Sequence, residues 1–222
     1  LTLLGTGSPV PSLKRASAGY MVQTGGDVIL IDHGPGTFQR MMQAGVTATQ
    51  VSHVFFSHLH FDHCLDFVRL FLNRWDISPP DTPKLKVFGP PGLNHFVERL
   101  FGPDGAFKLD LEARTEHEVS LSIYRRRGGI PPRPWPEAVI TEVAETDAIV
   151  GNGWRMTLAN VPHVQPYLVS YGVRLEADSG VFAYSSDISL PVDKSPAKPM
   201  YKLAQDADVL VHYLNSFDVS QE

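Results

Sequence analysis

The chain has 222 residues and a mass of 24.5 kDa, with 43% hydrophobic and 19% charged residues. This composition is typical of a folded globular protein and excludes a wholly disordered chain. The net charge of −5 argues against a protein that holds nucleic acid through a global basic field. The single cysteine excludes an intramolecular disulfide, and no apolar run approaches the ~20 residues of a membrane span. Because residues 1–7 resemble a strand rather than a secretory signal, we expect a cytoplasmic protein with no membrane partner.

Short apolar runs and glycine-containing turns predict alternating strands and helices over the first hundred residues. Strands are expected at 1–4, 20–22, 28–31, 51–56 and 85–88. Helices are expected at 37–44, 64–75 and 92–101. The Gly25-Gly26 pair joins the second and third strands, because glycine adopts the positive φ angles that a tight hairpin requires.

The second half of the chain begins with a change in composition. Residues 102–137 are rich in proline and glycine, which predicts an extended excursion with an inserted Arg/Pro/Gly-rich loop at 125–136. Strands then return at 138–143, 154–159, 171–175, 181–184 and 209–211, with a helix at 201–207. Runs of strands in two halves, with helices between them, predict an α+β protein with two mixed sheets packed face to face and helices outside. Because the sequence shows no boundary between separate domains, we expect a single domain over residues 1–222.

The densest group of candidate ligands follows the strand at 51–56. His58, His60, Asp62 and His63 fall within six residues. Imidazole and carboxylate groups suit zinc and related divalent metals. His58 and His60 alternate, so extended backbone would place them on one face, while Asp62 and His63 follow where the chain turns into a helix. This segment therefore predicts ligands for two neighbouring metal ions.

Two later residues complete the predicted site. His163 lies just beyond the strand at 154–159, and Asp187 lies just beyond the strand at 181–184. Either residue alone would be interpreted as an ordinary surface or capping residue. Together with the histidine cluster, they are candidates for ligands supplied from the second half of the chain.

The pattern His58-x-His60-x-Asp62-His63, followed by His163 and Asp187, resembles the metal motifs of the metallo-β-lactamase superfamily. The segments Leu4-Gly5-Thr6-Gly7-Ser8-Pro9 and Leu30-Ile31-Asp32-His33-Gly34-Pro35-Gly36-Thr37 are similar to the branch that contains ribonuclease Z and related arylsulfatases. The resemblance covers nearly the whole chain and implies an αββα sandwich.

The resemblance also implies a role for each candidate residue. One zinc would be held by His58, His60 and His163. The second would be held by Asp62 and His63, with Asp187 bridging both metals. A hydroxide between the metals would attack the ester, with Asp62 and Asp187 as the catalytic carboxylates. Asp32 would orient a ligand imidazole by accepting a hydrogen bond from it, the alternative being an ordinary turn residue before Gly34. Manganese or iron remains an alternative to two zinc ions.

The chain departs from the family pattern at the second metal. The family implies one more histidine after the bridging aspartate, whereas this sequence has only His212 beyond Asp187. Tyr213 stands where the family pattern has glutamate. We expect that the C-terminal part of the domain is absent from this sequence, with His212 as a substitute ligand being the alternative.

The substrate is less well specified. Pro11-Ser12-Leu13-Lys14-Arg15-Ala16 only partly matches the basic loop of ribonuclease Z, and the basic segment 125–136 is short for a tRNA-gripping arm. We therefore expect hydrolysis of a small anionic ester, first a phosphodiester, with tRNA not favoured and a homodimer left open. The alternatives are an aryl sulfatase or lactonase and a non-catalytic metal-binding relative. A di-iron oxidoreductase is disfavoured, because His60 stands where those relatives place glutamate. No substrate-binding residue is assigned.

Overall fold

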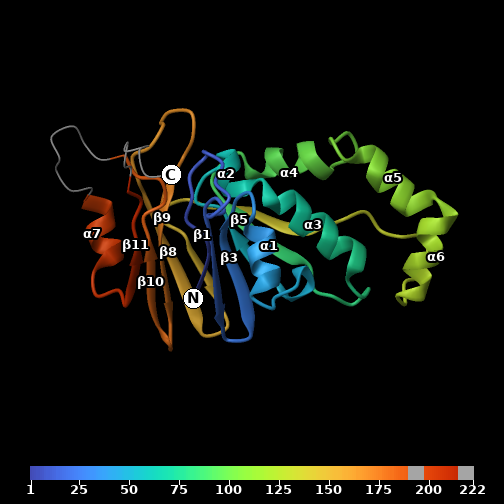
Figure 1. Ribbon diagram of the computed structural model, residues 1–222, viewed down its shortest axis with the longest axis horizontal. Coiled ribbons are helices and arrows are strands. Elements are labelled where there is room, and N and C mark those ends of the chain that lie inside the picture. Colours follow the sequence, from blue (N-terminus) through green and yellow to red (C-terminus); the bar gives the residue numbers. More distant parts are fainter. Residues whose placement is uncertain (190–197, 215–222) are drawn as a thin grey trace. The chain divides into compact units, whose positions relative to one another are not determined.

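The computed structural model describes residues 1–189 and 198–214 (Figure 1). The chain divides into two compact units, Leu1–Val143 and Ala144–Glu222, and each unit contains one β-sheet. This agrees with the two halves expected from the strand pattern, whereas their folding as one domain stays a prediction. Among the described residues, no helix is both long and apolar enough to cross a membrane.

The sheet of the first unit has six strands. In sheet order they are β1 (Thr2–Gly5), β2 (Gly19–Thr24), β3 (Asp27–His33), β4 (His53–Phe55), β5 (Leu85–Gly89) and β6 (Ala138–Glu142). Strands β1 to β3 pair antiparallel, and β3 to β6 pair parallel. Because β3 and β4 run in the same direction, the residues that follow them emerge at the same edge of the sheet.

Four helices of this unit pack against the sheet through their apolar faces. They are α1 (Thr37–Gln43), α2 (Phe61–Cys64), α3 (Asp66–Ile77) and α4 (Leu93–Phe101), with a short 3-10 turn at Ala48–Gln50. Fully buried Met41, Phe67 and Leu70 join Leu30 and Val54 of the sheet in one hydrophobic cluster. Burial of this apolar surface fixes α2 and α3 directly behind the end of β4.

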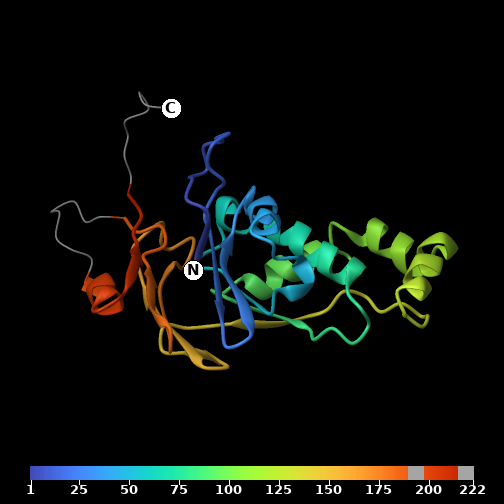
Figure 2. The ribbon, with the colours of Figure 1, turned by 60° about the horizontal axis from the view of Figure 1, so that its bottom comes forward.

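Two helices form an arm where the sequence predicted an extended excursion. They are α5 (Lys108–Glu116) and α6 (Glu118–Arg126), and we call this pair the arm (Figures 1 and 2). Ion pairs one turn apart support α5, with Arg114 Nε 2.9 Å from Asp110 Oδ2. His117 caps α6 by accepting a hydrogen bond from the amide of Val119. The prediction for residues 102–137 was therefore wrong over the arm, because the prolines and glycines of this segment lie before and after the two helices and not within them. The Arg/Pro/Gly-rich segment correspondingly begins in the last turn of α6.

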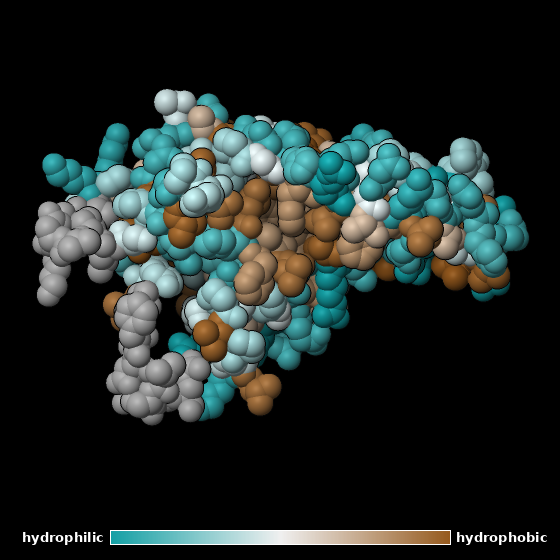
Figure 3. Space-filling model, turned by 90° about the horizontal axis from the view of Figure 1, so that it is seen from above, coloured by the Kyte–Doolittle hydropathy of each residue, from teal (hydrophilic) through white to brown (hydrophobic). Residues whose placement is uncertain are grey.

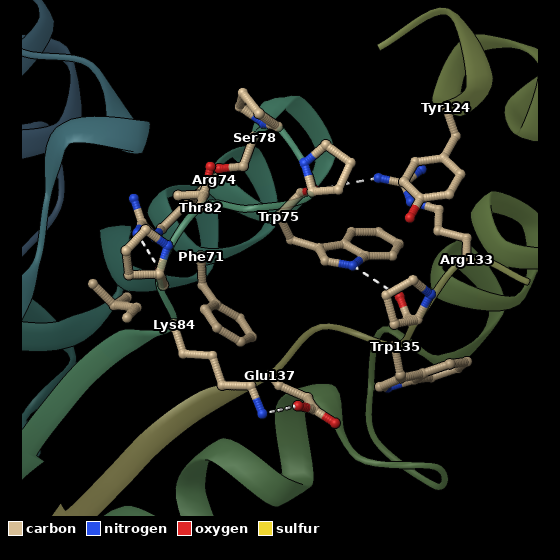
Figure 4. A pocket seen from close by; sticks show the side chains of 15 residues that line it. Phe71, Arg74, Trp75, Ser78, Thr82, Lys84, Tyr124, Arg133, Trp135 and Glu137 are labelled. Carbon is tan, nitrogen blue, oxygen red and sulfur yellow. Dashed lines mark hydrogen bonds and ion pairs between the residues drawn. The ribbon is translucent and has the colours of Figure 1, made fainter. Parts of the chain in front are cut away.

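The base of the arm is held by one carboxylate and three guanidinium groups. Asp76, near the end of α3, lies 3.0 Å from Arg133, 3.2 Å from Arg114 and 3.5 Å from Arg127. Arg133 also lies across Trp75, with its guanidinium carbon 3.9 Å from the ring centroid (Figure 4). These contacts tie α5, and the segment that follows α6, to α3.

The sheet of the second unit has five strands. In sheet order they are β11 (Val209–Val211), β10 (Gly180–Tyr184), β9 (Tyr171–Ala177), β8 (Trp154–Asn160) and β7 (Ala148–Gly151). Strands β7 to β10 pair antiparallel, whereas β10 and β11 are parallel. Helix α7 (Lys198–Ala204) buries Met200 and Leu203 beside the end of β8. Strand β7 was not predicted, because it is a four-residue edge strand whose Val150 is largely exposed.

Candidate metal centre

Asp32 organises the part of the candidate site that belongs to the first unit. It lies at the end of β3, fully buried, and its Oδ1 accepts a hydrogen bond from the Ser57 amide at 2.8 Å. Its Oδ2 accepts a hydrogen bond from Ser57 Oγ at 2.7 Å and lies 2.8 Å from His63 Nδ1. A protonated Nδ1 facing this carboxylate leaves His63 Nε2 with a lone pair, which is the tautomer that a metal ligand needs.

Ser57 orients the neighbouring imidazole in the same way. Its hydroxyl donates to Asp32, so Ser57 Oγ accepts from His58 Nδ1, which lies 3.0 Å away. This fixes His58 Nε2 as an acceptor, and Nε2 faces His60 Nδ1 at 3.0 Å. Two ring nitrogens at this separation are compatible with a shared cation, since zinc–nitrogen bonds are about 2.0–2.1 Å long. The donor atoms therefore fit a divalent metal.

Asp62 and His63 begin helix α2 and are both buried. Asp62 Oδ2 lies 3.6 Å from His63 Nε2, so this carboxylate faces the ring nitrogen that Asp32 leaves as an acceptor. The loop after β3 packs directly on this turn, because a Cβ atom added to Gly34 would lie 1.8 Å from the Asp62 carbonyl oxygen. Glycine is required at position 34 for this close approach.

The second unit presents the two later candidates side by side. His163 follows β8 and Asp187 follows β10, and His163 Nε2 lies 4.0 Å from Asp187 Oδ2. Ser186 precedes Asp187 with a left-handed φ of 54°, and its buried hydroxyl lies 3.1 Å from Ser170 Oγ. Within this unit, the predicted histidine and aspartate therefore face one another from the ends of two strands.

Ser57, His33 and His212 lie near these motifs in the sequence but contribute differently to the candidate site. Ser57 was missed as a functional residue in the sequence analysis. The signal that could have found it is its position just after β4, which places it beside Asp32 at the sheet edge. Burial lowers the pKa of His33 to about 3, so this ring is neutral, and its Nδ1 lies 2.9 Å from Thr37 Oγ1. His212 is exposed, and its Nδ1 donates a hydrogen bond to the Tyr213 carbonyl, so its use as a ligand stays an open alternative.

Comparison with known proteins gives a consistent result. Residues 14–199 match the family model described as the metallo-beta-lactamase superfamily. Ribonuclease Z from Mycolicibacterium gilvum (strain PYR-GCK) is 33% identical over 214 residues, which cover 96% of this chain and 67% of that protein. Ribonuclease Z from Mycobacterium bovis (strain BCG / Pasteur 1173P2) is 30% identical over 220 residues, which cover 99% of this chain and 71% of that protein. The chain thus spans about two thirds of the length of these relatives.

Solved structures share the fold. The short form of human tRNase Z superposes with a TM-score of 0.64 at 19% identity, covering 98% of this chain and 78% of that one. The metallo-beta-lactamase fold protein YhfI from Bacillus subtilis gives a TM-score of 0.59 at 17% identity, covering 86% and 64% of the two chains. The predicted fold class and the prediction of a ribonuclease Z-like, metal-dependent hydrolase are confirmed. The chain belongs to the metallo-β-lactamase superfamily.

Proposed function

We propose that this protein is a phosphodiesterase that uses two divalent metal ions, with zinc as the expected metal, and acts on a small anionic ester. The observation that carries the proposal is the buried network around Asp32, which sets the tautomers of two imidazoles. The proposed metal ligands are His58, His60, Asp62, His63, His163 and Asp187. Two ions rather than one are proposed because these six candidate ligands exceed the four that a single tetrahedral zinc ion takes.

The residues of the chain would prepare the reaction as follows. When bound, divalent metals lower the pKa of a coordinated water and stabilise negative charge on the ester oxygens. Asp32 holds His63 so that Nε2 points away from the carboxylate, and Ser57 does the same for His58. Asp62 would accept a hydrogen bond from the attacking water, and Asp187 would be the second catalytic carboxylate.

The charge of the arm supports a small substrate over tRNA. Within residues 108–126, four basic side chains face four acidic ones, namely Lys108, Arg114, Arg125 and Arg126 against Asp110, Glu112, Glu116 and Glu118. Arg125 lies 2.6 Å from Glu118, and Arg114 is paired with Asp110 and Asp76. A surface that grips phosphates needs lysines and arginines whose charge is not already neutralised. We therefore expect weak binding of tRNA by the arm.

Processing of pre-tRNA is the second candidate. It is favoured by the relatives named ribonuclease Z at 30–33% identity, and by an arm placed between the histidine cluster and His163. The alternative esters, an aryl sulfate or a lactone, use the same metal chemistry. A cytoplasmic location and a homodimer stay predictions.

One preparation of the protein tests these candidates together. Metal content is measured first, and then hydrolysis of chromogenic phosphodiester, sulfate and lactone substrates is compared with cleavage of a pre-tRNA. We expect phosphodiester hydrolysis to be fastest and to fall at least ~100-fold in Asp62→Ala, because general acid–base groups contribute about 10²–10⁴-fold. Arg126→Ala, on the exposed end of α6, is the matched control and should retain activity. Efficient 3′ processing of pre-tRNA that is lost on removing residues 125–127 would instead establish the second candidate.

A further inference from the structure

Helices α2 and α3 present an apolar stripe that begins at the metal motif. Phe61, Leu65, Val68 and Leu72 follow one another at spacings of four, three and four residues, so they lie along one helical face. Phe61 is 56% exposed and Leu65 is 51% exposed. Phe61 stands between His60 and Asp62 in the sequence, so the stripe starts beside two candidate ligands.

The stripe continues as one wall of a groove in the first unit. Leu65, directly before α3, and Val68 and Leu72 of α3 line it together with Leu100 and Phe107, which lie at the end of α4 and just before α5. The groove has a volume of about 610 Å³, which is within the range of sites for small organic ligands. In the view from above, apolar side chains, drawn in brown, are visible among the hydrophilic ones as far as the arm at the right (Figure 3).

The two ends of the groove differ in chemistry. Along α3, Leu65 and Asp76 bracket it over about 16 Å, from the rise of 1.5 Å per helical residue. At the far end, Asp76 and Arg114 close it with an ion pair of 3.2 Å. Near its start, exposed Arg69 lines the groove, with its guanidinium carbon 4.5 Å from the centroid of the Phe38 ring. Within residues 1–189 and 198–214, no carboxylate lies within ion-pair distance of Arg69. The near end can therefore accept negative charge. Beyond it, the apolar wall is interrupted by Asn73, and Asp110 joins the polar residues of the far end.

We infer that this groove binds the apolar alkyl or aryl group of an anionic phosphodiester whose phosphate lies at the metal motif. The inference rests on the proposed function and names its substrate class. Exposed apolar side chains that continue into a groove are typical of a binding surface, and here the exposed Phe61 and Leu65 lie close in sequence to candidate ligands and lead to the partly buried wall of the groove. The charge of Arg69 complements the phosphate, and the apolar wall complements the group that the phosphate carries. Substrate discrimination would thus depend on hydrophobic contact.

A series of p-nitrophenyl phosphodiesters with methyl, butyl and octyl groups tests the groove. If the groove binds the alkyl chain, kcat/KM rises along the series, by at most about fourfold for each fully buried methylene. We expect at least a tenfold gain from methyl to octyl. Leu65→Asp, at an exposed position that tolerates the change, and Leu72→Asp should each remove most of that gain. Leu109→Asp, on the arm outside the groove and 79% exposed, is the control and should keep it.

An equilibrium measurement separates the groove from the catalytic proposal. Octyl phosphate and methyl phosphate are titrated by calorimetry into the metal-free protein, below the concentration at which octyl phosphate forms micelles. We expect octyl phosphate to bind at least tenfold more tightly to the wild type, and this preference to be lost in Leu65→Asp. If no ester is hydrolysed but this preference is found, the proposed function fails and the groove stands. If esters are hydrolysed without any effect of chain length, and both phosphates bind alike, the groove assignment is overturned while the function stands.

Discussion

Replacement of Asp76 by asparagine is expected to loosen the arm from the body of the first unit. Asp76 is the carboxylate that faces Arg133, Arg114 and Arg127 together. The Arg133 side chain is only 4% exposed, so its charge would lose its carboxylate partner without gaining water. A hydrogen bond between charged groups contributes about 1.5–3 kcal/mol, whereas each half-exposed pair to Arg114 or Arg127 contributes about 0–1 kcal/mol. Because asparagine keeps one acceptor oxygen, we expect the free energy of unfolding to fall by about 2 kcal/mol.

Urea unfolding followed by tryptophan fluorescence measures this change, since Trp75 and Trp135 lie at the base of the arm. Asp110→Asn is the matched control, because Asp110 forms an exposed pair with Arg114 alone and should cost less than about 0.5 kcal/mol. Hydrogen exchange should accelerate in α5 and α6 in Asp76→Asn but not in the control. Equal losses of stability in the two variants, with unchanged exchange in the arm, would refute the role given to Asp76.

The contacts of Asp76 also predict how the stability of the protein depends on pH. Burial acts to raise the pKa of Asp76, but the hydrogen bond from Arg133 and the charges of Arg114 and Arg127 outweigh it, so its pKa lies below the usual range. A carboxyl group with a lowered pKa stabilises the fold above its unfolded pKa, and this contribution is lost as pH falls through the folded value. The stability difference between wild type and Asp76→Asn should therefore be constant near neutral pH and shrink only in strongly acidic solution. A difference that already shrinks between pH 7 and pH 6 would contradict this assignment.

Three further outcomes follow from the site. Asp32→Asn should keep the backbone conformation but lower the affinity for zinc by about 10–100-fold, because an amide no longer sets the tautomer of His63. An unchanged zinc affinity, measured by calorimetry, would contradict the role given to Asp32. Gly34→Ala should displace Asp62 and reduce both metal content and activity, whereas Gly26→Ala, where a Cβ meets nothing within 4 Å, should affect only stability. Burial and the nearby charges of Asp32 and Asp62 raise the pKa of the Cys64 thiol to about 12, so it should react with a thiol reagent at pH 8 only after unfolding.

Much of the fold could be predicted because its apolar periodicity is strong. The hairpin of β2 and β3, the strand before the histidine cluster and the helix α3 all lie within a few residues of their predicted bounds. The arm was missed because its helices bury almost nothing, so they lack the apolar stripe on which the prediction relied. Helix propensity and ion pairs one turn apart were the available signals, and the neighbouring prolines outweighed them.

The candidate site was predictable to the extent that its residues are adjacent in sequence. His58, His60, Asp62 and His63 are recognised by spacing, and the structure gathers their side chains at the end of β4. The contacts of Asp32 depend on β3 and β4 being parallel neighbours, which spacing along the chain does not reveal. The joint use of these residues with His163 and Asp187 stays a prediction. The anchor at Asp76 was also missed, because its three arginines are 38 or more residues further along the chain.

The backbone at Asp32 has a consequence for how this protein can change in evolution. Its φ of 57° is left-handed, a conformation that costs most residues about 1–2 kcal/mol and that asparagine, aspartate and glycine adopt most readily. The side chain must also supply both oxygens of a short carboxylate. Glutamate supplies a carboxylate but does not readily adopt the left-handed backbone conformation. Asparagine and glycine adopt that conformation but supply no carboxylate. A library of all substitutions at position 32 should therefore fall into two classes, variants that keep the stability but bind metal less tightly and variants that are destabilised by the strained backbone, with aspartate alone in neither.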